Sequence, residues 1–142
     1  RGVSGGLRPG GAVPRPAAVG AVVLARFASF VCPGPAAGLC EVDRVLAPGR
    51  RLVDVDNDPE HGEFAALLAA RYPAMDVGGW WAQQGSERRE VMSDWQFDNW
   101  ADLDAVLRLE FPAQVADNWL TEHPDRTGLS YGYLLYATTP KR

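Results

Sequence analysis

Residues suited to ligand binding follow two predicted strands of this 142-residue chain, at the point where each strand ends. Open α/β sheets bind their ligands beyond the carboxyl ends of parallel strands, so residues at these two points should border a binding site. They are Phe27, Ala28, Ser29 and Phe30 after the first strand, and Asp56 and Asn57 after the second. The sequence therefore predicts one site to which both strand ends contribute.

The same positions also have structural explanations. Phe27 and Phe30 would pack against adenine or a substrate, or they would be core residues that need no function. Asp56 would orient a substrate, or it would hold the turn that Asn57-Asp58-Pro59 predicts. His61, near the start of the next predicted helix, would act as a general base near neutral pH, or it would lie on the surface in contact with water. The residues alone leave these alternatives open.

A second group of candidates lies in residues 74–88, which predict a loop because Gly78-Gly79 stands at their centre. Trp80 and Trp81 follow these glycines, and such large apolar side chains are costly to leave in water. They would cover a pocket and contact a substrate, or fold back onto the core. Arg88 and Arg89 would meet an anionic group of a substrate, or belong to a charged strand edge.

Several kinds of chemistry have no matching motif. The sequence contains no Ser-His-Asp nucleophile elbow, no CxxC pair and no phosphate-binding P-loop. Cys32 and Cys40 are eight residues apart with no nearby histidine, so we expect free thiols and neither a metal site nor a disulfide framework. The net charge is -4 and the basic residues are dispersed, which favours a small-molecule partner over nucleic acid. No apolar run approaches the roughly 18 residues of a membrane span, so a cytoplasmic protein is expected.

The elements that must position these residues alternate between strand and helix. Residues 1–18 are rich in Gly, Pro and Arg and predict a disordered lead, and residues 19–142 predict one domain. Strands are expected at 21–27, 51–56, 89–97 and 129–138, and helices after Pro35, at 61–72, after the Asn99 and Asp102 capping pair, and after Pro112. Strand, helix, strand and helix in succession indicate parallel pairing with right-handed crossovers. Residues 89–97 alternate as a half-buried strand does, with Val91, Trp95 and Phe97 on one side.

One stretch resembles a known family. Glu41-Val42-Asp43-Arg44-Val45-Leu46, the turn Ala47-Pro48-Gly49 and the strand closing on Asp56 are similar to the lead into the fifth strand of class I methyltransferases, which use S-adenosylmethionine. Leu134 to Thr138 resembles the antiparallel last strand of that family's sheet. The resemblance runs from about residue 20 to residue 139, and it would include the family's fourth to seventh strands.

The resemblance implies a fold and an activity. The fold would be α/β, a partial Rossmann-like sheet with flanking helices and an antiparallel last strand. The activity would be methylation of a small molecule by S-adenosylmethionine. Phe27, Ala28 and Ser29 would contact the cofactor, whereas Phe30, Asp56, Trp80 and Trp81 would contact the substrate. It assigns no catalytic residue.

The sequence departs from this family in the part that holds the cofactor. The family has a glycine-rich turn after its first strand and an acidic residue after its second strand. The glycine-rich run Gly5 to Gly11 follows no strand, contains Pro9 and precedes no helix. We therefore expect weak cofactor binding, or none, unless the cofactor half is supplied, so that the chain as given would be truncated and inactive. Arg50 stands where the family usually has a second glycine, and a positive φ there would cost roughly 1 kcal/mol.

Two other functions remain open. Without the family's first three strands, the strand at 21–27 would expose an unpaired edge, which predicts a non-catalytic interaction module or remnant that forms a homodimer. A nucleotide-dependent reductase would share the fold, because fold alone does not fix function. The Pro48-Gly49 turn and the aromatic last strand favour the methyltransferase over the reductase.

Overall fold

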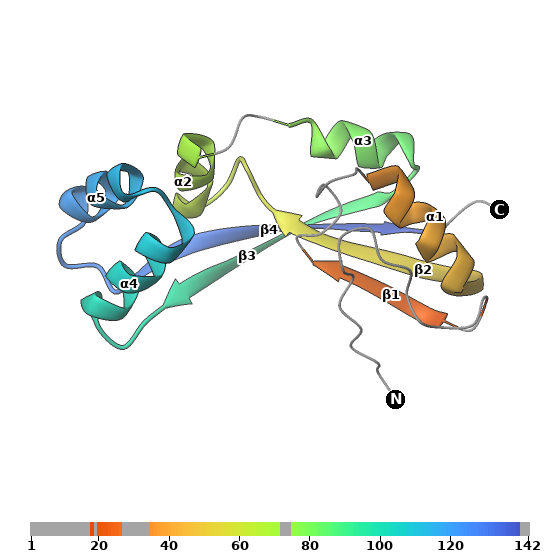
Figure 1. The fold of residues 1–142 in the computed structure, drawn as a ribbon, viewed down its shortest axis with the longest axis horizontal. Helices are drawn as coiled ribbons and strands as arrows, with labels where there is room; N and C mark the ends of the chain where they lie inside the picture. Colours follow the sequence, from red (N-terminus) through yellow and green to blue (C-terminus); the bar gives the residue numbers. More distant parts are fainter. Residues whose placement is uncertain (1–17, 19, 27–34, 72–74, 140–142) are drawn as a thin grey trace. The chain divides into compact units, whose positions relative to one another are not determined.

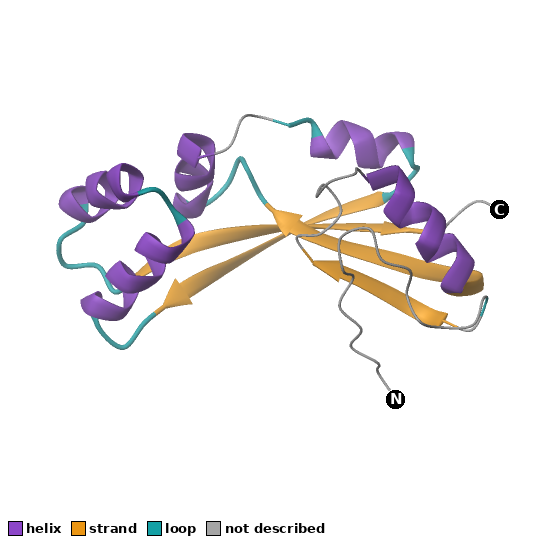
Figure 2. Cartoon of the chain, viewed as in Figure 1, coloured by secondary structure: helices purple, strands orange, loops and turns teal. Residues whose placement is uncertain are grey.

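The computed structural model describes residues 18, 20–26, 35–71 and 75–139. Strands and helices alternate along this part of the chain, as the α/β prediction requires (Figures 1 and 2). The strands are β1 (Gly20–Arg26), β2 (Leu46–Asn57), β3 (Glu87–Gln96) and β4 (Gly128–Thr138). The helices are α1 (Pro35–Val45), α2 (Glu63–Arg71), α3 (Val77–Gln83), α4 (Trp100–Glu110) and α5 (Ala113–Glu122). The disordered lead that we predicted at residues 1–18 lies outside the described residues, except for residue 18.

The strands form one sheet in the order β1-β2-β4-β3. β1 and β2 pair in parallel, with Val23 opposite Leu52 and Leu24 opposite Val53, and α1 connects them. The arrow of β4 points opposite to those of β2 and β3, so the last strand is antiparallel (Figure 1). The predicted fold class, a partial Rossmann-like sheet with flanking helices and an antiparallel last strand, is therefore confirmed.

The chain divides into two compact units. The first contains the described residues up to Asp56, Val77–Arg89 and the described residues from Leu135 onward; the second contains Asn57–Asp76 and Glu90–Leu134. β3 and β4 each contribute residues to both units.

The core of the first unit includes residues of α1, β2, α3 and β4. Val42 and Val45 of α1 are buried, as is Leu52 of β2, in agreement with the predicted apolar stripe. Trp81 of α3 is buried and stacks on Tyr136 of β4, with ring centroids 5.6 Å apart. Residues 77–83 form the helix α3, so our prediction of a loop there was wrong.

The Pro48-Gly49 pair lies inside β2 and does not separate a helix from a strand. β2 begins at Leu46, directly after α1, and its register against β1 shifts between Gly20, which pairs with Leu46, and Val22, which pairs with Arg51. Gly49 has a φ of 72° and provides the backbone freedom that this irregularity needs. Arg50 is not among the described non-glycine residues with positive φ, so the expected strain at Arg50 is absent.

The core of the second unit is formed by residues of α2, α4, α5 and β4. The buried cluster contains Phe64, Leu67, Leu103, Leu107, Phe111, Ala116, Trp119, Leu120, Leu129 and Tyr131. The helices were predicted from apolar residues three and four positions apart, and these residues do form the buried faces. Asn99 caps α4 as expected, because its side chain accepts a 3.0 Å hydrogen bond from the amide of Asp102.

β3 differs from the half-buried strand that we predicted. It ends the strand order of the described sheet, and most of its side chains, Val91 included, are exposed. Trp95 is half-buried and lies against the second unit's core, with its ring stacked on Tyr131 at 5.4 Å. Among the described helices, none combines the length and apolar character needed to cross a membrane.

Candidate functional site

Of the seven residues predicted to contact cofactor or substrate, the structure describes three. Phe27, Ala28, Ser29 and Phe30 lie outside the described residues, so their contacts with cofactor or substrate stay predictions. Asp56 is half-buried near the end of β2, and Trp80 and Trp81 are neighbours on α3. Burial raises the pKa of Tyr136, the stacking partner of Trp81, and Asp56 acts in the same direction although Arg88 opposes it. Asp56 and Trp81 thus both belong to the surroundings of one tyrosine.

The turn that follows β2 contains a more complete polar arrangement. The Oδ1 atom of Asp58 accepts hydrogen bonds from the amide of Glu60 at 2.8 Å and from the amide of His61 at 3.2 Å. An aspartate that binds the backbone two and three residues ahead forms a turn of its own, which explains why the chain reverses here. Asp58 therefore holds the turn, a role that the sequence had suggested for Asp56.

The second carboxylate oxygen of Asp58 binds the ring of His61. Oδ2 lies 3.0 Å from Nδ1 of His61, and the Asp58 side chain is fully buried whereas that of His61 is 52% exposed. Because the carboxylate can only accept, Nδ1 carries the proton, and the lone pair of the neutral ring is on Nε2. The pair therefore presents a basic nitrogen of defined tautomer on a half-exposed ring.

The β4 strand fixes this turn from the other side. The amide of Asp58 donates a 2.9 Å hydrogen bond to the carbonyl of Gly132. A Cβ on Gly132 would lie only 2.7 Å from the Cβ of Asp58, so only glycine permits this approach. Gly62, with a φ of 87°, approaches the carbonyl of Ser130 in the same way. The site thus depends on two glycines as much as on its charged groups.

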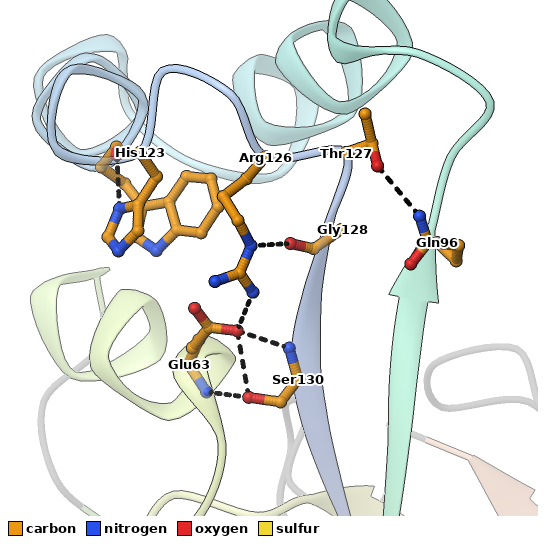
Figure 3. A network of polar contacts seen from close by, with 8 residues as sticks. Glu63, Gln96, His123, Arg126, Thr127, Gly128 and Ser130 are labelled. Carbon is orange, nitrogen blue, oxygen red and sulfur yellow. Dashed lines mark hydrogen bonds and ion pairs between the residues drawn. The ribbon is translucent and has the colours of Figure 1, made fainter.

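A second polar network joins α2 to β4 next to this turn (Figure 3). Oε2 of Glu63 accepts hydrogen bonds from the amide of Ser130 at 2.9 Å, from its hydroxyl at 3.2 Å and from Nη2 of Arg126 at 2.8 Å. The amide of Glu63 in turn donates to the Ser130 hydroxyl at 2.9 Å. Burial by itself would raise the pKa of Glu63, but the Ser130 bonds and the charge of Arg126 outweigh it and lower that pKa. This network fixes the start of α2, directly after His61.

The electrostatic surroundings of His61 are acidic. The hydrogen bond to Asp58 is the main reason that the pKa of His61 is raised, followed by the charge of Asp58 itself. Glu90 of β3 and Glu60 add to the same effect, while partial desolvation opposes it. These carboxylates stabilise the protonated imidazolium, which is the form that a general base produces when it takes a proton.

Sequence reasoning identified His61 but missed its partner. Asp58 is part of the Asn57-Asp58-Pro59 turn signal, and an aspartate three residues before a histidine also allows contact across a tight turn. The Asp58-Pro59-Glu60-His61 spacing is the signal that could have revealed the pair. In the part of the chain that the structure describes, no group of three or more His, Cys, Asp or Glu side chains could hold a metal ion.

The fold is similar to solved structures of methyltransferases. A proposed methyltransferase from Bacillus halodurans C-125 matches with a TM-score of 0.50 and 19% sequence identity, over 88% of this chain and 66% of that chain. A proposed type II methyltransferase from Anaeromyxobacter dehalogenans has a TM-score of 0.49 and 16% identity, over 88% and 66% of the two chains. No protein-family profile and no curated protein matches the sequence. The chain thus spans 66% of the length of the Bacillus structure, and at this identity the likeness shows that its α/β fold is methyltransferase-like.

Proposed function

We propose that this chain is the C-terminal part of an S-adenosylmethionine-dependent methyltransferase that acts on a small molecule in the cytoplasm. The observation that carries the proposal is the sheet, in which β1 and β2 are parallel and an antiparallel β4 lies between β2 and β3. The likeness to the Bacillus protein supports the same activity. The Glu41 to Asp56 stretch, which resembles class I methyltransferases, is the part of this sheet on which the sequence resemblance rests.

Methyl transfer makes modest demands on a protein. S-Adenosylmethionine, when bound, supplies a methyl group that is already activated by a sulfonium. The chain's own residues must align the acceptor with that group, and they must remove a proton only if the acceptor atom carries one. This explains how an enzyme could work without any of the catalytic motifs that the sequence lacks.

The described residues do not supply the part that holds the cofactor. In the described ranges, the turns that lead from a strand into a helix are residues 58–62 and 97–99, and they contain a single glycine, Gly62, so neither is glycine-rich. Such a turn would direct backbone N–H groups at the ligand. We therefore expect residues beyond those described here to complete the cofactor site.

The test compares this chain with a longer polypeptide. DNA upstream of the codon for Arg1 is sequenced in all three frames, in search of a strand followed by Gly-x-Gly-x-Gly and an acidic strand end. The joined protein should bind S-adenosylhomocysteine in a calorimeter and convert S-adenosylmethionine when a mixture of small acceptors is present, whereas this chain alone should bind weakly. Failure of the joined protein to bind, or absence of the motif, would overturn the proposal, and binding of nicotinamide cofactors instead would favour the reductase.

A second function is favoured by the exposed side chains of β1. Val22 and Leu24 alternate along this strand, at one end of the strand order, and are 61% and 64% exposed. Exposed apolar residues on a terminal strand favour pairing with another chain. The occupant that we propose is a second copy of this chain, because the same edge and the same apolar face can then serve both partners in a two-fold dimer.

Sedimentation equilibrium of two matched variants tests this dimer. Val22→Lys places a charge on the β1 surface and should weaken dimerisation by about tenfold or more, which corresponds to 1.4 kcal/mol. Met75→Lys is the control, since Met75 is also 61% exposed but is not on β1. A wild-type chain that sediments as a monomer at every concentration would exclude the dimer.

A further inference from the structure

We propose that His61 is a general base, whose Nε2 atom takes a proton from a nucleophile bound next to the turn that follows β2, and that Asp58 is its positioning residue. Identifying the nucleophile as the methyl acceptor rests on the function proposed above. The base itself stands on the geometry of the turn.

The first observation is the rigidity of the Asp58 carboxylate. It is buried and accepts two backbone hydrogen bonds through Oδ1, and the Asp58 amide is bound to the carbonyl of Gly132. A buried carboxylate needs such partners, and once they are made its remaining oxygen has little freedom. The imidazole that binds this oxygen at 3.0 Å is therefore held in one orientation.

The second observation is the state of the other ring nitrogen. Nδ1 of His61 is occupied by Asp58, and among the described residues no contact is found for Nε2. The His61 side chain is 52% exposed, so small molecules in solution can reach the ring. A histidine held through Nδ1 by a buried carboxylate, with Nε2 open, has the arrangement by which general-base histidines are oriented.

The third observation is the sign of the surrounding charge. Among the described residues, the charged groups that act on the ring are Asp58 and Glu60 from the turn and Glu90 from β3, and all three are carboxylates. They favour the imidazolium that proton transfer creates. In a protein that transfers a methyl group from a sulfonium, the positive charge would move from sulfur to this imidazolium, where the carboxylates stabilise it.

The proton balance of the step is complete. The nucleophile would gain the methyl group as the methyl–sulfur bond breaks and its electron pair stays on sulfur. The nucleophile's bond to hydrogen breaks as well, and that proton passes to Nε2 of His61. Water then takes this proton and restores the neutral ring. Nε2 thus acts as a base when the acceptor is a hydroxyl, a thiol or an amine. It has no role when the acceptor atom carries no proton.

Hydrolysis of ethyl dichloroacetate by the purified chain measures the base without any cofactor, because its poor leaving group disfavours direct attack by imidazole. Here Nε2 takes a proton from water as the water oxygen attacks the ester carbonyl, and dichloroacetate and ethanol are released. The contribution of His61 is the difference between the rate constants of the wild type and of His61→Gln. This difference should exceed the rate constant of free N-acetylhistidinamide at the same imidazole concentration by about threefold or more, because a held base is more effective than a free one. His123→Gln is the control, because the Nδ1 atom of His123 contacts the carbonyl of Trp119 and no carboxylate.

The pH dependence tests the role of Asp58. In Asp58→Asn the midpoint of the pH–rate profile should move to lower pH, because the carboxylate that raises the pKa of His61 is gone. An NMR titration of the His61 ring should show the same shift. Glu90→Gln, which leaves the turn intact, should give a smaller shift in the same direction and keeps the test valid if Asp58→Asn unfolds.

The outcomes separate the two proposals. A His61 rate no greater than that of the free amide, or a midpoint that moves in neither variant, would overturn the general base whatever the cofactor experiments show. A different outcome is that His61 passes both tests, with the expected hydrolysis rate and the expected shifts of the pH–rate midpoint, while the joined protein binds no S-adenosylhomocysteine. This result would support the general base and reject methyl transfer.

Discussion

The amide of Asp58 donates a hydrogen bond to the carbonyl of Gly132, and this 2.9 Å contact ties the turn after β2 to the middle of β4. The approach is so close that a Cβ on Gly132 would lie 2.7 Å from the Cβ of Asp58 and 3.0 Å from the carbonyl oxygen of His61. The residue that orients the His61 ring is thus held by a strand more than seventy positions further along the chain.

Gly132→Ala should destabilise the protein by about 1–3 kcal/mol, since the added methyl group forces the turn away from β4. It should also lower the pKa of His61, because the Asp58 carboxylate shifts with the turn. Urea unfolding and an NMR titration measure the two effects. Gly38→Ala is the control: a methyl group added there would have nothing within 4 Å, and Gly38 lies in α1, so stability should rise by up to about 1 kcal/mol. Equal effects of the two variants would contradict the close approach.

Glu63→Gln should reduce stability at neutral pH by about 1–2 kcal/mol, because the side chain loses charge-assisted bonds to Ser130 and Arg126. The pKa of Glu63 is lowered from its ordinary value of 4.5, so its contribution is present above that pH and is lost as the pH falls through the lowered pKa. The difference between wild type and variant, followed by urea unfolding, should therefore shrink below about pH 4.5. Glu110→Gln, at the exposed end of α4, is the control and should change stability by less than about 0.5 kcal/mol.

Trp81→Ala should cost about 3–5 kcal/mol, because the indole is fully buried against Tyr136 and its removal leaves a cavity. Trp80→Ala should cost clearly less, since the neighbouring ring is only half-buried. Urea unfolding of both variants checks the order. A larger loss for Trp80 would show that α3 presents its other face to the core.

Leu103→Ala should cost about 2–5 kcal/mol, whereas Leu109→Ala should change stability by less than about 0.5 kcal/mol. Both leucines are on α4, but Leu103 is 0% exposed and Leu109 is 83% exposed. Thermal unfolding distinguishes them, and similar losses would contradict the orientation of α4.

The helices of the second unit could be predicted because their sequences contain local information. Apolar residues three and four positions apart in α4 and α5 defined the buried faces, and Asn99 with Asp102 marked where α4 begins. α3 could not be predicted, since glycine and tryptophan pairs usually indicate a loop. In α3, Trp81 is buried against Tyr136, and this contact joins residues that are far apart in sequence.

The candidate site shows the same division. The sequence by itself determined the strand β2, the turn after it and a histidine near the start of the next helix, because each depends on neighbouring residues. Only the tertiary structure decided that Asp58 binds the backbone of that turn and orients His61. The physical reason is that burying a carboxylate requires several donors at once and a strand close enough to exclude water, and Gly132 of β4 allows that strand to approach.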